Sequence, residues 1–104
     1  MASGTIIKSI KDFAKQVNAN GIQLKKVILF GSYANDKQTK YSDIDVALVA
    51  DEFSGVASED VKLFLSALRN HYMVQAQTFN TKYFTKGDPF IDEIKRTGIE
   101  IKLA

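Results

Sequence analysis

The sequence predicts a single α/β or α+β domain in which a small mixed β-sheet is covered by packed helices. Its 104 residues are 45% hydrophobic, which suits one compact core over residues 1–104, because domains commonly hold roughly 100 to 150 residues. Segments with helical periodicity alternate with short apolar runs typical of strands. No internal repeat, low-complexity tract or linker interrupts that order.

The first half of the chain predicts one helix and two strands. Apolar residues spaced four, three and four apart predict an amphipathic helix ending near Asn20-Gly21; they are Ile6, Ile10, Phe13 and Val17. The apolar run 27–30 is rich in strand formers and stops at Gly31. Residues 44–50 alternate but are mostly apolar on both faces, which predicts a central strand.

The second half predicts two helices and two strands. In chain order we expect a helix from a Ser58 cap to near Asn70, a strand over 72–79, a loop or short helical turn over 80–84, a helix from Asp88 to Gly98 and a strand over 99–103. Asp88 is a suitable cap and Pro89 suits the first helical position. Phe90, Ile91 and Ile94 are expected to form the apolar face of that helix.

Composition excludes several classes of protein. The chain has no cysteine and one histidine, which excludes thiolate catalysis, disulfides and the common structural zinc sites. A formal net charge of +2 argues against direct nucleic-acid binding, since the basic residues are interleaved with acids. Charged residues interrupt the apolar positions near the N-terminus, so we expect no signal peptide, no membrane association and a cytoplasmic location.

A glycine-serine pair follows the first predicted strand directly. Glycine lets the backbone approach an anion closely, the Ser32 hydroxyl can donate a hydrogen bond, and free N–H groups at a helix start favour negative charge. Gly31-Ser32 followed by the small Ala34 therefore fits a phosphate-binding turn, although such a pair is more often a plain turn. Lys37 or Lys40 can offset phosphate charge, or can lie as solvated charges on the loop.

Two aspartates flank Ile44 at the start of the second predicted strand. Because strand side chains alternate with period two, the carboxylates of Asp43 and Asp45 point to the same side. Such a close pair of like charges calls for a cation, and oxygen-rich sites suit Mg²⁺ or Mn²⁺ carried in with a triphosphate. The alternative is a structural role in which Asp43 caps a turn.

The two motifs together are more specific than either alone. The chain reads Gly31-Ser32-Tyr33-Ala34 and then Ser42-Asp43-Ile44-Asp45-Val46. This resembles the G-S-x-A and S-D-I-D signature of minimal nucleotidyltransferases, small members of the DNA polymerase beta superfamily. The similarity covers residues 31–49, and the order of the other elements is similar as well. It implies a polymerase-beta-like nucleotidyltransferase fold.

The same resemblance implies an activity and a site. The activity is transfer of a nucleoside monophosphate from an Mg-bound NTP, ATP foremost, to a hydroxyl acceptor. Gly31, Ser32 and nearby backbone would hold the β- and γ-phosphates, and the catalytic Asp43 and Asp45 would ligate two divalent metals. Because 104 residues leave no room for an acceptor-binding domain, we expect a partner chain. The resemblance implies a helical HEPN-type partner, as in toxin and antitoxin pairs.

One position departs from the family pattern. Active relatives carry a third carboxylate on the next strand, where this chain has Gln75, with Gln77 next on the same face. A glutamine amide carries no charge and cannot accept a proton at neutral pH. A shifted alignment would let another acid complete the site, namely Asp51, Glu52 or Glu100. The sequence thus leaves open an impaired nucleotidyltransferase and a degenerate nucleotide- or partner-binding module, such as an antitoxin-type partner of a HEPN-like protein.

The remaining histidine and tyrosines fit structural roles. His71 lies between a predicted helix and strand with no acid near it in sequence, so we interpret it as a boundary residue. Tyrosine rings can stack a base, but we expect these to pack at element edges with their hydroxyls in water; they are Tyr33, Tyr41, Tyr72 and Tyr83.

Overall fold

The central element is a four-stranded mixed sheet with strand order β3-β2-β1-β4. The computed structural model describes residues 3–39 and 42–103. In it β1 (Leu24–Phe30) runs antiparallel to β2 (Ile44–Ala50) and to β4 (Ile99–Glu100), while β3 (Val74–Asn80) runs parallel to β2. The predicted class, a small mixed sheet with packed helices, is confirmed.

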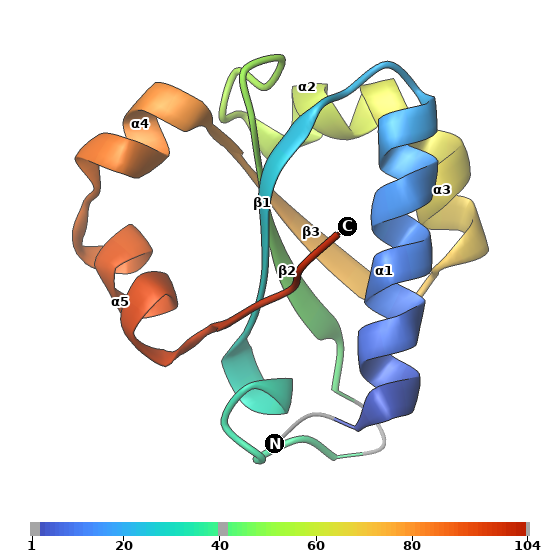
Figure 1. The fold of residues 1–104 in the computed structure, drawn as a ribbon, viewed down its shortest axis with the longest axis vertical. Helices are drawn as coiled ribbons and strands as arrows, with labels where there is room; N and C mark the ends of the chain where they lie inside the picture. Colours follow the sequence, from blue (N-terminus) through green and yellow to red (C-terminus); the bar gives the residue numbers. More distant parts are fainter. Residues whose placement is uncertain (1–2, 40–41, 104) are drawn as a thin grey trace.

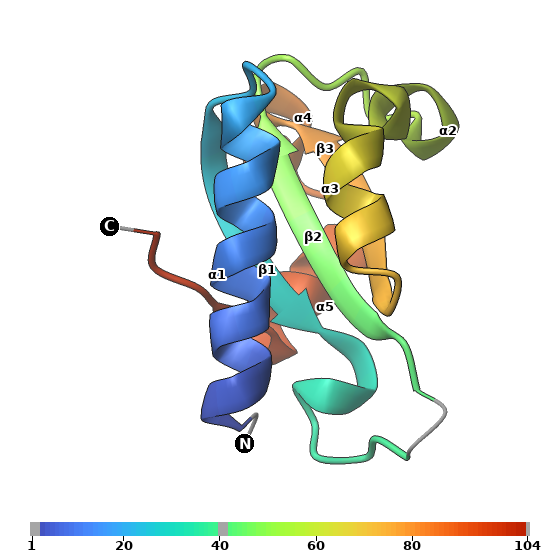
Figure 2. The ribbon, with the colours of Figure 1, turned by 90° about the vertical axis from the view of Figure 1, so that its right-hand side faces the viewer.

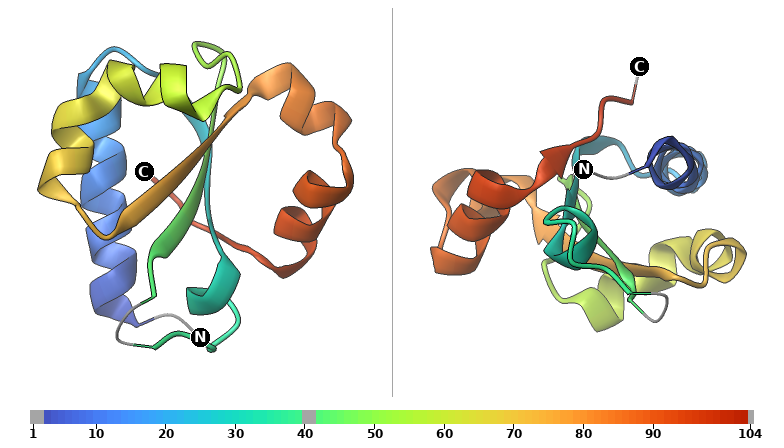
Figure 3. Two further views of the ribbon diagram at one scale, coloured as in Figure 1. Left: turned by 180° about the vertical axis from the view of Figure 1, so that it is seen from behind. Right: turned by 90° about the horizontal axis from the view of Figure 1, so that it is seen from below.

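Helices cover both faces of this sheet. One face is covered by α1 (Gly4–Ala19) and by the segment formed by α2 (Ala57–Asp60), η2 (Val61–Phe64) and α3 (Leu65–Asn70). The other is covered by α4 (Thr81–Lys86) and α5 (Pro89–Thr97). The two groups stand on opposite sides of the strands in Figure 1 and in the right-hand view of Figure 3. The domain therefore has three layers.

Side-chain alternation in β2 divides the core in two. Its even-numbered residues pack against α1 and α3 in the larger cluster, while Ala47 and Val49 pack against α4 and α5 in the smaller one. All but one of the β2 residues are buried, and the exception is Asp45. The prediction that this strand is central is confirmed, because only a strand covered on both faces tolerates such a composition.

The predicted limits of the first and last helices are close to those observed. α1 ends at its C-cap Asn20. Asp88 caps α5, with its carboxylate accepting a hydrogen bond from the Ile91 amide at 2.7 Å, and Pro89 is the first helical residue. Gly98 ends that helix as expected. The segment 80–84, expected to be a loop or short helical turn, comprises the N-cap and the first four residues of the short helix α4.

The single helix predicted from Ser58 to Asn70 is wrong in detail. Ser58 lies inside α2, and the N-cap is Val56, which makes no side-chain capping bond. The helical path breaks at Phe64, whose backbone angles are φ −141° and ψ 38°. The Phe64 ring packs between Phe13 and Phe53, with centroids 6.1 and 5.8 Å away. Burial of this ring accompanies the division of the segment into short turns.

Two strand limits also differ from the prediction. Tyr72 and Met73 form a turn, so β3 begins two residues late. β4 holds only two residues rather than five. Ile101 still donates a backbone hydrogen bond to Val27 at 2.7 Å and is buried, but the exposed Lys102 follows and the chain leaves the sheet edge, as Figure 2 shows.

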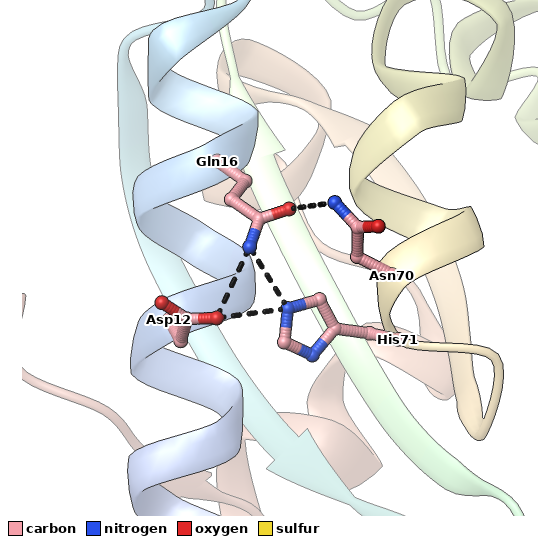
Figure 4. A network of polar contacts seen from close by, with 4 residues as sticks. All are labelled: Asp12, Gln16, Asn70 and His71. Atoms are coloured by element: carbon pink, nitrogen blue, oxygen red, sulfur yellow. Dashed lines mark hydrogen bonds and ion pairs between the residues drawn. The ribbon is translucent and has the colours of Figure 1, made fainter.

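A polar network joins α1 to the end of α3 (Figure 4). His71 Nε2 lies 3.1 Å from the Asp12 carboxylate, and Gln16 bridges the pair to Asn70, which donates to Gln16 at 2.9 Å. The sequence offers no acid near His71, but the fold supplies Asp12 from 59 positions away. His71 is also the C-cap of α3, so its interpretation as a boundary residue agrees with its position.

No helix within the described ranges is both long and apolar enough to span a bilayer.

Asp60 is buried and ties three segments together. Its carboxylate accepts hydrogen bonds from the Ser54 amide and hydroxyl, the Gly55 amide and the Thr78 hydroxyl, at 2.7 to 3.0 Å. Burial by itself raises the pKa of Asp60, but these hydrogen bonds outweigh it and hold the pKa below its ordinary value. The carboxylate therefore links the loop after β2, α2 and β3 in its ionised form.

We expect Asp60→Asn to lower the free energy of unfolding by about 1–3 kcal/mol at pH 7, since an amide leaves backbone donors unpaired. Because the folded-state pKa is lowered, this stabilisation is present above the ordinary aspartate pKa of 3.8 and is lost as the pH falls through the folded-state value. Urea unfolding at pH 7 and pH 3 measures both effects. The exposed neighbour serves as control, with Glu59→Gln expected to change little; equal losses in both variants would contradict the role given to Asp60.

Candidate functional site

Three chain segments meet at one end of the sheet, where β1 finishes and where β2 and β3 begin; we call this end the sheet edge. β1 ends at Phe30, whose Cα partner on the antiparallel β2 is Asp45. The parallel β3 brings Gln75 to the other side of Asp45. Phe30, Asp45 and Gln75 thus form one row across three strands, and cross-strand partners share a face. The turn η1 (Gly31–Tyr33) follows β1 at this edge, at the lower end of the sheet in Figure 1.

Gly31 packs directly against the Asp45 carboxylate. Its φ of +74° is a left-handed conformation that favours glycine, and an added Cβ would collide with the Asp45 side chain. The turn therefore requires glycine for two independent reasons. Ser32 follows it and is partly exposed. The structure brings the glycine-serine turn and the aspartate of the second motif into contact.

Asn35 fastens this turn. Its side-chain amide donates to the Gly31 carbonyl at 2.9 Å, and its backbone amide donates to the same oxygen at 3.2 Å. The Lys37 amide donates to the Ser32 carbonyl at 2.9 Å. No role for Asn35 was predicted from the sequence. The signal that could have found its role is the spacing of four residues from Gly31, which places a side chain over the preceding helical turn.

The two aspartates differ in their surroundings. Asp43 is exposed just before β2, whereas Asp45 is half-buried on the face covered by α4 and α5. Burial raises the pKa of Asp45, and the negative charge of Asp43 raises that pKa further. The ionised pair is therefore electrostatically unfavourable as it stands. A cation held between the carboxylates would offset this cost.

None of the three acids that a shifted alignment could offer lies beside this pair. Asp51 and Glu52 follow β2 at its opposite end, where Glu52 accepts a hydrogen bond from the Gln23 amide at 3.2 Å. Glu100 lies on β4 beside Ile28 and pairs with Lys26 at 3.6 Å. Within residues 3–39 and 42–103, no three His, Cys, Asp or Glu side chains cluster as a metal site.

The other predicted contributors lie as follows. Lys37 is exposed on the loop after the turn. Lys40 and Tyr41 fall outside the described residues. Tyr33 is buried within η1, while Tyr72 and Tyr83 are 87% and 50% exposed. Tyr83 donates a hydrogen bond to Asp88, the cap of α5.

Comparison with known protein families identifies the fold that carries this site. A family model described as a nucleotidyltransferase domain matches residues 7–104, which include the turn and both aspartates. The chain belongs to this family. The resemblance to minimal nucleotidyltransferases and the assignment of the fold are thereby confirmed. Membership supports nucleotidyl transfer as the general activity of such a domain.

Two curated relatives come from Methanocaldococcus jannaschii, and each is named "Putative protein adenylyltransferase". The first is 37% identical over 79 residues, which cover 72% of this chain and 79% of the relative. The second is 28% identical over 100 residues, which cover 92% of this chain and 98% of the relative. The chain is therefore similar to the second relative over nearly the whole length of both.

The nucleotidyltransferase family suggests an NTP substrate and a divalent metal in general terms, and the residues at the sheet edge fit such an ion. Mg²⁺ takes oxygen ligands and is commonly held by one or two carboxylates completed by waters and substrate phosphates. Asp43 and Asp45 supply two carboxylates, and Gln75 lies beside Asp45 with an amide oxygen. A positive charge held there would also favour the ionised form of Asp45, which burial and the Asp43 charge disfavour.

Asp45→Asn should raise the free energy of unfolding of the metal-free protein at neutral pH, because it removes a partly buried charge and its repulsion with Asp43. A raised folded-state pKa favours the folded state while the carboxyl is protonated. That advantage is lost as the pH rises from the ordinary value of 3.8 through the folded-state pKa. The increase in the free energy of unfolding caused by Asp45→Asn is thus expected at pH values above the folded-state pKa. It should shrink below the ordinary pKa of 3.8.

Urea unfolding midpoints at pH 7 and pH 3, measured with a chelator present, check this prediction. Asp43→Asn is the matched comparison, and its gain at pH 7 should be smaller because Asp43 is exposed. An Asp45→Asn variant less stable than the natural protein at pH 7 would show that Asp45 stabilises the fold.

Proposed function

We propose that this domain transfers a nucleoside monophosphate from ATP to a hydroxyl group of a protein and releases pyrophosphate. The observation that carries the proposal is the contact between Gly31 and the Asp45 carboxylate, because it joins a candidate phosphate turn to a candidate metal pair. Membership in the nucleotidyltransferase family supports the reaction type. ATP and a protein acceptor are proposed because both relatives are named protein adenylyltransferases.

Each residue at the sheet edge has a proposed role. Gly31 lets the backbone approach the β- and γ-phosphates, Ser32 donates its hydroxyl to them, and Lys37 offsets their charge. Asp43 and Asp45 hold Mg²⁺ or Mn²⁺. When bound, such an ion supplies charge stabilisation to the attacking and leaving oxygens. Asn35 keeps the turn in the shape that this binding requires, through its bond to the Gly31 carbonyl.

The transfer step forms one bond and breaks another. The acceptor hydroxyl oxygen bonds to the α-phosphorus, and the bond from that phosphorus to the bridging oxygen of the β-phosphate breaks. Pyrophosphate leaves, and the acceptor proton must go to a base. Gln75 lies beside Asp45 but cannot accept that proton. Water or the acceptor protein has to take it, which makes the transfer slow.

A partner chain presenting the acceptor completes the proposal. The resemblance to minimal nucleotidyltransferases favours a helical HEPN-type protein, as in toxin and antitoxin pairs. A second function is favoured by Gln75 in the row of Asp45. In that case the domain binds a nucleotide or its partner without turnover.

Nucleotide binding is the first test. Calorimetric titration with ATP in the presence of Mg²⁺ should show binding that chelator abolishes. The double variant Asp43→Asn/Asp45→Asn should lose at least about tenfold in affinity, because one or two carboxylates anchor the ion that accompanies the triphosphate. Asp51→Asn/Glu52→Gln, which removes two acids at the far end of β2, is the matched control and should bind normally.

Pyrophosphate release followed in the same samples separates the two functions. Release supports the transferase, and metal-dependent binding without release supports the binding module. An absence of metal-dependent binding to any nucleoside triphosphate would contradict both.

Restoring an acid at position 75 tests the role of the third position. Gln75→Asp should raise pyrophosphate release by roughly 10²- to 10⁴-fold, the usual contribution of a positioned general base. Gln77→Asp puts the same charge on the same strand face one row further from Asp45 and should give no comparable gain. An active natural protein that gains nothing from Gln75→Asp would show that another group already serves as the base.

A further inference from the structure

Phe90 is an apolar ring left half in solvent beside the candidate site. It was expected to lie on the buried face of α5, yet it is 48% exposed, while Ile91 and Ile94 of the same helix are buried. Its ring still contacts two others: the centroids of Phe30 and Phe79 are 5.8 and 6.2 Å away. The ring is thus packed against two residues of the sheet and is open to solvent on its other side.

These two contacts locate Phe90 on the sheet. Phe30 on β1 is the partner of Asp45, and Phe79 on β3 is the partner of Val49. Phe30 and Phe79 thus lie on opposite sides of β2, at rows four residues apart. A ring in contact with both lies across β2 near the small Ala47. Ala47 is the next residue after Asp45 on this face of the strand. Phe90 therefore lies on the same face as the Asp45 carboxylate and next to it along the strand.

A second side chain on this face has an amide with no hydrogen-bond partner in the described part of the chain. Gln77 is the cross-strand partner of Ala47, so it lies beside the position of the Phe90 ring. It is half-buried, and its amide makes no hydrogen bond within residues 3–39 and 42–103. Its amide atoms are open to solvent, so a ligand on this face can reach them. A glutamine amide offers one donor and one acceptor side by side, the pattern that pairs with the amino group and ring nitrogen of adenine.

We propose that Phe90 and Gln77 form the nucleobase site of this domain, with the base stacked on the Phe90 ring and its edge read by the Gln77 amide, which favours adenine. The proposal rests on the proposed function, because the phosphates must be anchored at Gly31-Ser32 and the metal at Asp43 and Asp45. When those groups are fixed, the base of the same nucleotide can reach Phe90 and Gln77, because they lie on the sheet face that carries Asp45. Stacking tolerates any base, so preference comes from Gln77.

Inorganic tripolyphosphate separates the base from the phosphates in the test. The natural protein is titrated with ATP, GTP, CTP, UTP and tripolyphosphate, each with Mg²⁺. Phe90→Ala should weaken all four nucleotides by roughly 5- to 150-fold, the usual range for loss of one base stack. It should leave tripolyphosphate affinity unchanged. Phe90→Leu, which keeps apolar bulk without a π-face, should resemble Phe90→Ala.

Two further variants sharpen the result. Gln77→Met removes the amide at similar size, and it should reduce the ratio of ATP to GTP affinity toward one. Tyr72→Ala is the matched control, because it removes an exposed ring that lies away from the proposed base site. Tyr72 borders a groove on the other side of the sheet, which is also lined by Thr5 and Ile6 of α1. It should change neither nucleotide nor tripolyphosphate binding.

The outcomes distinguish this inference from the function on which it rests. If Phe90→Ala binds nucleotides as well as the natural protein, or loses tripolyphosphate affinity to the same extent, the base site is wrong and the nucleotidyltransferase proposal stands. If Phe90→Leu binds as the natural protein does, the ring contributes bulk and stacking is excluded. If the natural protein binds neither nucleotide nor tripolyphosphate, the proposed function itself fails.

Discussion

The placement of Asp45 between Phe30 and Gln75 is the constraint on which the rest of the site depends. The register of the antiparallel pairing with β1 sets Asp45 opposite Phe30. The register of the parallel pairing with β3 sets it opposite Gln75. A slip of one residue in either pairing would turn every side chain of a strand to the opposite face. The buried residues of β2 prevent such a slip, since both of its faces are covered. The core thus holds the site in register.

Two locally unfavourable features lie together at this end of the sheet. Gly31 adopts a left-handed conformation and leaves no space for a side chain. Asp45 is an ionisable group whose charged form is disfavoured by burial and by a neighbouring carboxylate. A fold selected for stability alone would avoid both. Features of this kind tend to gather at functional sites, which agrees with the function proposed for this end of the sheet.

Much of this arrangement follows from the sequence. Period-two alternation predicted that Asp43 and Asp45 share a side, which agrees with the effect of the Asp43 charge on the pKa of Asp45. Cap residues predicted where α5 begins and ends. The break at Phe64 was not predictable, because it depends on rings distant in sequence that pack around it. The partners of Asp60, the bond from Asn35 to Gly31 and the exposure of Phe90 also depend on tertiary contacts. Local patterns specify elements, whereas such contacts need the register of the sheet.

The parallel pairing of β2 and β3 joins residues thirty positions apart, since Asp45 faces Gln75. The antiparallel pairing of β1 and β2 joins residues only fifteen apart at the same row, from Phe30 to Asp45. Closing the longer loop costs more chain entropy, and non-local pairings of this kind form slowly. A chain still emerging during synthesis can therefore bring Gly31 against Asp45 before β3 exists. On the proposed function, the groups for metal and phosphates therefore assemble first, and the surface proposed to receive the base is completed last.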